Sequence, residues 1–284
     1  MGLYAAARRL GRVEALDRAA GPLASAVTRV VRPGPLKDAL TGAWLGHPLH
    51  PLLTDIPIGS FTSATVLDVL GGARSAPAAD TLVAIGLAAA VPTALAGATD
   101  WSDTYGDDQR IGVVHAVANT VGLGCYALSL AARRRGARGA ATAWGLAGMS
   151  SMTVGGHLGG FLGYSRGVGV NHTFLDEPPQ DWTAVMADGE LADGQPAPAW
   201  AGRTPILLYR SGSTIEAIAA RCSHAGGPLD EGTVDTSACT VECPWHHSVF
   251  RLTDGGVVHG PASTPQPAYD ARVTGGRIEV RERR

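Results

Sequence analysis

Two short runs near the C-terminal end contain the residues of this chain that are best suited to chemistry. They read Cys-Ser-His at 222–224 and Cys-Pro-Trp-His at 243–246, so each supplies one thiolate and one imidazole. This mixed set can hold a two-iron, two-sulfur cluster, with two thiolates on one iron and two imidazoles on the other. Imidazoles in place of two thiolates raise the reduction potential of such a cluster. We therefore expect a metal centre with the ligands Cys222, His224, Cys243 and His246.

A structural zinc site is the alternative, because zinc also binds two cysteines and two histidines. Zinc sites usually pair like ligands, with two cysteines in one arm and two histidines in the other. Here each arm is mixed, and the two arms use different spacings. Glycine and proline beside the ligands also suit backbone amides that close on cluster sulfides. The pattern favours the iron–sulfur cluster and leaves zinc as the alternative.

The residues around the ligands add a resemblance to this argument. The stretches 222–229 (CSHAGGPL) and 243–250 (CPWHHSVF) resemble the two cluster loops of Rieske iron–sulfur proteins. The resemblance covers about residues 181–284 and implies a small all-β domain. Short β-prone runs at 206–209 and 215–219, separated by a turn, agree with that fold.

Further residues near the cluster follow from the same resemblance. Gly260-Pro261-Ala262 resembles the proline-containing loop that covers the cluster in this family. Ser248 stands where the subunits of respiratory bc complexes place a serine that donates to a cluster sulfide, and Phe250 replaces their tyrosine donor. The extra cysteine that each loop of those subunits carries is missing here. Fewer donors lower the reduction potential, so the resemblance implies a ferredoxin-type Rieske domain.

The N-terminal part of the chain has a different composition. Only 17% of all residues are charged, and they are scarce between residues 47 and 165. Uncharged or nearly uncharged runs of about twenty residues, enough for a helix to cross a bilayer, lie at 81–99, 111–132 and 141–164. A fourth run, 51–70, is interrupted by Asp55 and Asp68. We predict a membrane all-α four-helix bundle followed by the all-β domain.

A second resemblance supports the helical bundle. The segment 47–59 (HPLHPLLTDIPIG) resembles an uncharacterised family of four-helix bacterial membrane proteins with an H-P-x-H-P…I-P-x-G pattern. That resemblance implies a fold and no activity. The chain is therefore expected to contain an amphipathic membrane-surface segment (1–46), a transmembrane domain (47–165), a linker (166–180) and the Rieske domain (181–284).

Three histidines are candidates for a second cofactor site. His50, His115 and His157 fall in one leaflet if the four runs alternate in direction. Histidine ligates metals and carries protons, and helical bundles hold cofactors between facing helices. We predict a haem b or a quinone held by two of them, with His115 and His157 favoured as the pair. The simpler alternative is that these histidines only join helices through hydrogen bonds.

The charges indicate location and partners. A multi-pass protein of the bacterial inner membrane is expected, with its Rieske domain on the cytoplasmic side because cysteines for a disulfide clamp are missing. A cluster of arginines at 133–138 argues for the opposite orientation. The net charge of −2 offers no nucleic-acid footprint. Expected partners are a redox protein, the lipid membrane and a second copy of the chain.

The function that these features predict is one-electron transfer to or from a redox partner. The alternative is a quinol- or haem-linked membrane reductase that uses the bundle as a second redox site. A Rieske oxygenase would need a mononuclear iron in a separate catalytic domain. Since the chain ends just after the Rieske domain, we expect no such catalytic domain, and an electron carrier is favoured over a self-contained enzyme.

Overall fold

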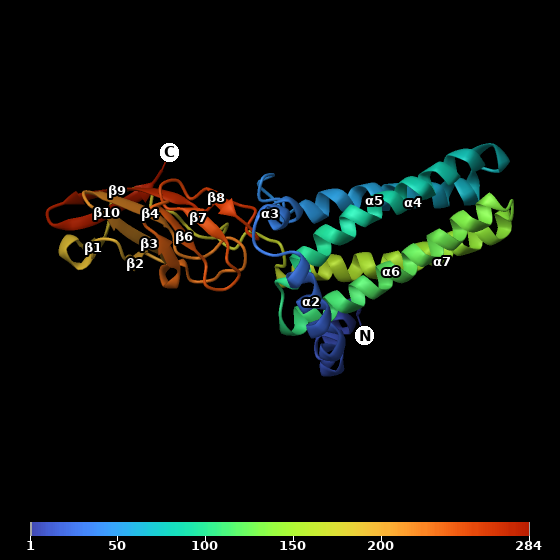
Figure 1. Ribbon diagram of the computed structural model, residues 1–284, viewed down its shortest axis with the longest axis horizontal. Coiled ribbons are helices and arrows are strands. Elements are labelled where there is room, and N and C mark those ends of the chain that lie inside the picture. Colours follow the sequence, from blue (N-terminus) through green and yellow to red (C-terminus); the bar gives the residue numbers. More distant parts are fainter. Residues whose placement is uncertain (1, 284) are drawn as a thin grey trace. The chain divides into compact units, whose positions relative to one another are not determined.

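The computed structural model describes residues 2–283 and divides the chain into two compact units (Figure 1). The helical unit comprises the residues up to 31 together with Leu49–Val168. The β unit comprises Arg32–Pro48 together with the residues from Gly169 onward. The segment 32–48 thus belongs to the β unit, whereas the sequence-based division groups it with the membrane-surface segment or, from residue 47, with the transmembrane domain.

Four long helices make up most of the helical unit. They are α4 (Leu49–Leu70), α5 (Ala76–Ser102), α6 (Gly106–Arg134) and α7 (Arg138–Gly160). Each corresponds to one of the apolar runs in the sequence. Helix α4 packs against α5 and α7, and α6 packs against the same two helices, so α4 and α6 face each other diagonally. Two helical hairpins, α4–α5 and α6–α7, therefore form the unit.

Membrane crossing is only partly supported by the helices themselves. Within the described residues, two helical segments are long and apolar enough to span a bilayer, Ala73–Ser102 and Gly106–Arg134. The other two helices fall below that standard for reasons visible in the sequence: α4 contains Asp55 and Asp68, and α7 is rich in glycine and serine. A helical N-terminal region is established, and its four membrane crossings stay a prediction.

Two shorter helices lie within the first thirty residues, in the segment 1–46 that the sequence predicts to be an amphipathic membrane-surface segment. They are α1 (Leu3–Gly11) and α2 (Asp17–Val30). Arg110 at the start of α6 fixes them: its guanidinium donates to both carboxylate oxygens of Asp17 at 2.7 Å and to the carbonyl of Gly11 at 2.9 Å. Apolar side chains on these helices, including Leu3 and Leu23, are exposed. That exposure is consistent with a lipid-surface segment.

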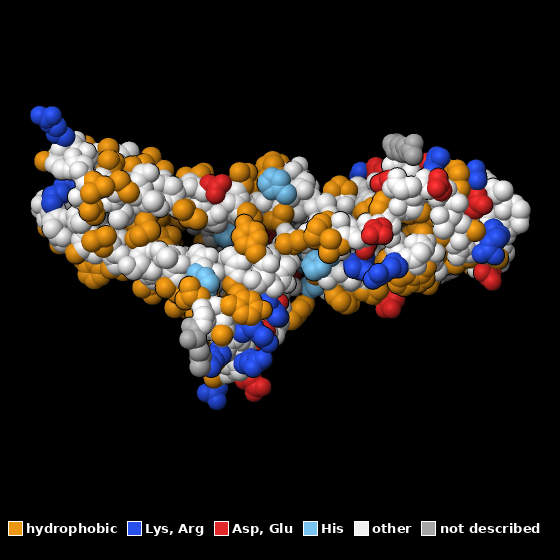
Figure 2. Space-filling model, turned by 180° about the vertical axis from the view of Figure 1, so that it is seen from behind, with side chains coloured by type: hydrophobic (Ala, Val, Ile, Leu, Met, Phe, Trp, Pro, Cys, Tyr) orange, Lys and Arg blue, Asp and Glu red, His pale blue; other side chains and the backbone are white. Residues whose placement is uncertain are grey.

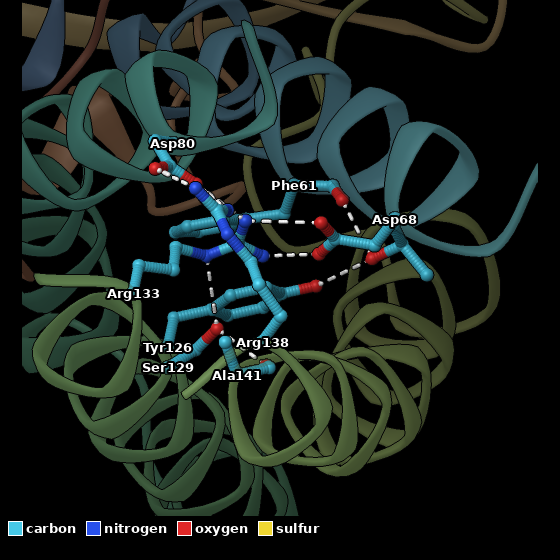
Figure 3. Close-up of polar contacts among 9 residues, drawn as sticks. Phe61, Asp68, Asp80, Tyr126, Ser129, Arg133, Arg138 and Ala141 are labelled. Atoms are coloured by element: carbon cyan, nitrogen blue, oxygen red, sulfur yellow. Dashed lines mark hydrogen bonds and ion pairs between the residues drawn. The ribbon is translucent and has the colours of Figure 1, made fainter. Parts of the chain in front are cut away.

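A buried ion-pair network joins all four long helices at one end of the unit (Figure 3). Each helix contributes one charged residue: Asp68 from α4, Asp80 from α5, Arg133 from α6 and Arg138 from α7. The Arg133 side chain is 1% exposed and donates to both carboxylates, at 2.9 Å in the case of Asp80. Arg138 pairs with the same Asp80. A buried guanidinium needs such partners, because an uncompensated charge in an apolar interior is costly.

The β unit consists of two antiparallel sheets. The six-stranded sheet has the order β1-β10-β9-β4-β3-β2, and its edge strands β1 and β2 approach each other, so the sheet curls. The four-stranded sheet has the order β5-β6-β7-β8. The strands are β1 (Thr183–Ala187), β2 (Pro196–Ala201), β3 (Thr204–Ser211), β4 (Thr214–Ala219), β5 (Thr233–Asp235), β6 (Thr240–Glu242), β7 (Val249–Arg251), β8 (Val257–His259), β9 (Ala268–Thr274) and β10 (Arg277–Glu282).

Strand β3 separates two hydrophobic cores. Side chains alternate across a strand, so Ile206 and Leu208 enter one core while Leu207 and Tyr209 enter the other. The second of these cores also contains both cysteines of the predicted cluster, each 1% exposed. The predicted metal centre is thus built directly on one of the two hydrophobic cores of the β unit.

Candidate metal centre

The two cysteine loops have the same backbone geometry. The first follows β4, and the second is the turn between β6 and β7. In each loop the cysteine amide donates to the carbonyl five residues later, Gly227 for Cys222 and Ser248 for Cys243, at 2.8 Å. The cysteine carbonyl accepts from the amide four residues later, and that residue has a left-handed backbone: φ is 77° at Gly226 and 63° at His247. Two equivalent loops thus present their ligands in matching ways.

The four predicted ligands converge as a sulfur pair and an imidazole pair. The thiols of Cys222 and Cys243 are hydrogen-bonded to each other, which raises the pKa of Cys222 and lowers that of Cys243. The rings of His224 and His246 lie edge to face with their centroids 4.8 Å apart. Among the described residues, no three His, Cys, Asp or Glu side chains gather around a single point. A thiol pair and an imidazole pair are what the predicted cluster would use, with one pair on each iron.

The histidine pair fits a metal-binding role on its own chemistry. The Nδ1 atom of His224 is buried and has no hydrogen-bond partner among the described residues. Burial is the main cause that lowers the pKa of His224 to about 3, and the imidazole of His246 is the next. A neutral imidazole is the form that binds metal. The buried Nδ1 of His224, which has no partner among the described residues, therefore suits a metal ligand.

The predicted covering loop is tied to the second cysteine loop through Ser248. Its hydroxyl oxygen accepts the amide of Ala262 at 2.9 Å, and the side chain is fully buried. Because the oxygen serves as acceptor, the hydroxyl proton stays available as a donor. Gly260 and Pro261 precede Ala262 in this loop. The predicted role of Ser248 as a donor to a cluster sulfide is therefore compatible with its surroundings.

Gly227 shows how tightly the first loop approaches the second. A Cβ atom at this position would lie 2.9 Å from the Cys243 sulfur and 3.1 Å from the Trp245 ring. Real Cβ atoms are almost never found so close to other atoms. Only glycine therefore lets the two loops close around a shared site.

A short helix that the sequence analysis did not connect with the site packs against the covering loop. Helix α3 (Pro35–Thr41) directs Asp38 toward this loop, where its carboxylate accepts the amide of Gly260 at 2.7 Å and Nδ1 of His259 at 2.9 Å. Lys37 of the same helix is 4% exposed and acts electrostatically on His224. No local sequence pattern signals this contact, because more than two hundred residues separate Asp38 from Gly260.

Two of the three candidate histidines of the helical unit are placed alike, and the third differs from them. Nδ1 of His50 lies 2.9 Å from the carbonyl oxygen of Thr93, and Nδ1 of His115 lies 2.7 Å from that of Gly155. His157 is exposed on α7. Among the described contacts, none joins His157 to His115. The structure therefore does not bring together the pair that the sequence favoured, since residue 157 falls on the outward face of its helix.

Removal of the Ser248 hydroxyl should lower the reduction potential of the cluster. A donor to a sulfide stabilises the extra negative charge of the reduced state, so Ser248→Ala favours the oxidised state. Phe250→Tyr should raise the potential by adding a donor. Protein-film voltammetry measures both midpoints. If neither variant shifts the midpoint while both bind the cluster fully, the alignment of this loop with the family is wrong.

Comparison with known proteins agrees with this architecture. Residues 181–270 match the family described as Rieske [2Fe-2S] domain, and residues 46–172 match the family described as predicted membrane protein (DUF2231). The anthranilate 1,2-dioxygenase ferredoxin subunit of Burkholderia cepacia is 32% identical over 100 residues, which are 35% of this chain and 91% of that subunit.

Two further relatives are also ferredoxins of dioxygenases. The 3-phenylpropionate/cinnamic acid dioxygenase ferredoxin subunit of Escherichia coli (strain K12) is 40% identical over 75 residues, 26% of this chain and 70% of that subunit. Among solved structures, the ferredoxin of carbazole 1,9a-dioxygenase from Nocardioides aromaticivorans IC177 is 29% identical with a TM-score of 0.35, and the match covers 37% of this chain and 100% of that one. Residues 46–172 match the predicted membrane protein family, and the chain belongs to the Rieske [2Fe-2S] family through residues 181–270.

Proposed function

We propose that this chain is a membrane-anchored one-electron carrier whose Rieske domain exchanges electrons with a protein partner. The observation that carries the proposal is the arrangement of the four ligands as a thiol pair in the buried core and an imidazole pair beside it. Cys222 and Cys243 hold one iron, and His224 and His246 hold the other. When bound, the cluster supplies a site that gains and loses a single electron.

The imidazole side of the centre is the side nearer to the surface. Both cysteines are 1% exposed, whereas His246 is 7% exposed and His224 is half-buried. Trp245, adjacent to His246, is 53% exposed. A large exposed aromatic side chain next to a ligand is suited to contact with a partner, since aromatic residues are enriched in protein interfaces. We assign the docking surface for the redox partner to the loop that contains Trp245.

The class of partner follows from the named relatives. Both curated relatives described above are ferredoxin subunits of dioxygenases, which supports a redox protein as the partner here. The same names support an electron carrier over a self-contained enzyme as the function of this chain. Which protein reduces the cluster and which oxidises it is a separate matter from the one-electron chemistry.

The helical unit supplies the membrane anchor in this proposal. Support comes from the match to a predicted membrane protein family and from two helices of sufficient length and apolarity. On the face shown in Figure 2, hydrophobic side chains cover much of the long helices, and basic side chains gather over α1 and α2. We extend this to four crossings of the bacterial inner membrane by α4, α5, α6 and α7.

The orientation that we propose places the Rieske domain in the cytoplasm. The arginines at 133–138 are the sequence feature that opposes this orientation. Two of them, Arg133 and Arg138, are paired with Asp68 and Asp80, so they count less as free positive charge. The exposed Arg134 and Arg135 still oppose it. Cysteine accessibility from each side of inverted vesicles tests this orientation.

Electron counting tests the function. The purified full chain, reduced with dithionite, should pass one electron per chain to oxidised cytochrome c, followed by stopped-flow absorbance. Trp245→Ala should slow this bimolecular step with an unchanged midpoint potential, because the side chain lies beside the ligands without being one. Trp200→Ala is the matched control, since Trp200 is also exposed, at 60%, and lies on β2. A cluster that cannot be reoxidised by any protein acceptor would contradict the carrier function.

A further inference from the structure

The two hairpins of the helical unit repeat the same contact residues. Residues of α4 correspond to residues of α6 that lie 65 positions later: His50 to His115, Phe61 to Tyr126 and Asp68 to Arg133. Residues of α5 correspond to residues of α7 that lie 62 positions later: Gly86 to Gly148, Thr93 to Gly155 and Gly97 to Gly159. This correspondence can be checked contact by contact.

The first repeated contact joins an aromatic ring of the first helix to a glycine of the second helix in each hairpin. A Cβ atom at Gly86 would lie 2.6 Å from the Phe61 ring, and a Cβ atom at Gly148 would lie 2.9 Å from the Tyr126 ring. In both hairpins the aromatic side chain of the first helix therefore rests on a glycine of the second. The contact is the same in each, although the ring has changed from phenylalanine to tyrosine.

The histidines repeat in the same way. His50 bonds to the carbonyl of Thr93, and a Cβ atom four residues later, at Gly97, would lie 2.6 Å from its ring. His115 bonds to the carbonyl of Gly155, and a Cβ atom four residues later, at Gly159, would lie 3.0 Å from its ring. Each imidazole is held against the second helix of its own hairpin by one carbonyl and one glycine.

Corresponding residues also meet across the centre of the unit. The Phe61 and Tyr126 rings stack with centroids 3.9 Å apart and an interplanar angle of 12°. Asp68 and Arg133 form an ion pair at the far end of the row (Figure 3). These contacts join the diagonal helices α4 and α6, so a pseudo-two-fold axis runs between the hairpins. His50 and His115 are the third pair of this row, eleven residues or about 16 Å along the helices from the aromatic pair.

The third pair differs from the other two in its chemistry. A carbonyl oxygen can only accept, so Nδ1 carries the proton in both imidazoles and Nε2 keeps its lone pair. Asn119 leaves this lone pair open in His115. Its amide nitrogen lies over the ring face, 3.2 Å from Nε2 and 3.4 Å from Nδ1, and donates to the backbone carbonyl of His115 at 3.0 Å. The matching contacts of His50 and His115 place the two imidazoles at the same level of α4 and α6. A histidine that ligates a metal through one ring nitrogen usually donates the N–H of the other to an oxygen, as Nδ1 does here toward Thr93 and Gly155. That hydrogen bond fixes the tautomer and the orientation of the ring.

We propose that Nε2 of His50 and Nε2 of His115 form a bis-imidazole site for a transition metal, either the iron of a haem or a bare divalent ion. The pseudo-two-fold relation gives each hairpin one such nitrogen, that of His50 on α4 and that of His115 on α6. His157 has no part in this site. The site is independent of the iron–sulfur cluster, so its absence would leave the electron-carrier function intact.

The test measures metal binding directly. The full chain with its cluster loaded is titrated with haemin, followed by the Soret band, and separately with Co²⁺, followed by visible absorbance. One equivalent should bind. His50→Ala and His115→Ala should each weaken binding at least about tenfold. Haemin binding identifies a haem site, and binding of Co²⁺ alone identifies a bare-ion site.

Glycine variants separate ligation from folding. Gly97→Ala and Gly159→Ala retain both histidines but displace one ring each, so binding should weaken by about ten- to a hundredfold. Gly156→Ala is the matched control, because a Cβ atom there meets nothing within 4 Å, and His157→Ala is the control for histidine loss. The proposal is overturned if neither probe binds the wild-type chain. It is also overturned if folded His50→Ala and His115→Ala variants bind as the wild type does, or if the extract yields only a quinone.

Discussion

Replacement of His246 by alanine should abolish the EPR signal of the reduced cluster, and His224→Ala should do the same. Each histidine supplies one of four ligands, and the iron that binds the imidazoles would be left with one protein donor. The expected loss of signal is close to complete, because each iron has only two protein ligands and one remaining ligand does not hold it. Iron and sulfide analysis of the purified variant measures it independently of the spectrum.

The neighbouring histidine offers a matched control. His247 directly follows His246, is exposed, and bonds to Glu242 at 2.6 Å. Its φ of 63° suits asparagine, so His247→Asn removes an imidazole from the same loop without backbone strain. This variant should keep the full signal. If His247→Asn loses the cluster as His246→Ala does, the assigned ligand set is wrong.

The second large effect is expected in the helical unit. Arg133→Ala should lower the free energy of unfolding by about 3–5 kcal/mol, because it leaves Asp68 and Asp80 without their shared buried cation. Thermal melting of the detergent-solubilised chain, followed by the circular dichroism of its helices, measures the change. Arg134→Ala alters an adjacent exposed arginine and should melt like the wild type.

A double variant sharpens that experiment. Asp68→Asn removes one carboxylate, so its combination with Arg133→Ala should be less destabilising than the sum of the two single changes. Residues in one ion-pair network couple in this way, whereas independent residues add. If Arg133→Ala melts together with Arg134→Ala, the network does not stabilise the bundle.

The cluster loops could be predicted from the sequence because chemistry restricts them so strongly. Few residue types bind iron, and the loop glycines and Ser248 stand at fixed offsets from those ligands. The same holds for the long helices, whose apolar runs give their positions directly. Local patterns therefore identified the β domain, the helical region and the four candidate ligands.

Contacts between distant segments were beyond such patterns. Asp38 and Lys37 lie in a segment that was interpreted as part of a lipid-surface region, yet Asp38 bonds to the covering loop at Gly260. Arg133 belongs to the arginine cluster that the orientation argument uses as positive charge outside the membrane, whereas the structure buries it in an ion-pair network. The sequence shows that His157 lies farther inside its helix than His50 does. It does not show which way a side chain faces, and the structure exposes His157.

The central claim is that the β unit holds one two-iron, two-sulfur cluster with mixed ligands. Metal and sulfide analysis of the purified full chain, with EPR of the dithionite-reduced state, tests it most directly. The account predicts two sulfides and two cluster irons per chain, with any haem iron counted separately from its absorbance, and a Rieske-type signal. A properly folded chain that contains zinc and lacks both iron and labile sulfide would contradict it.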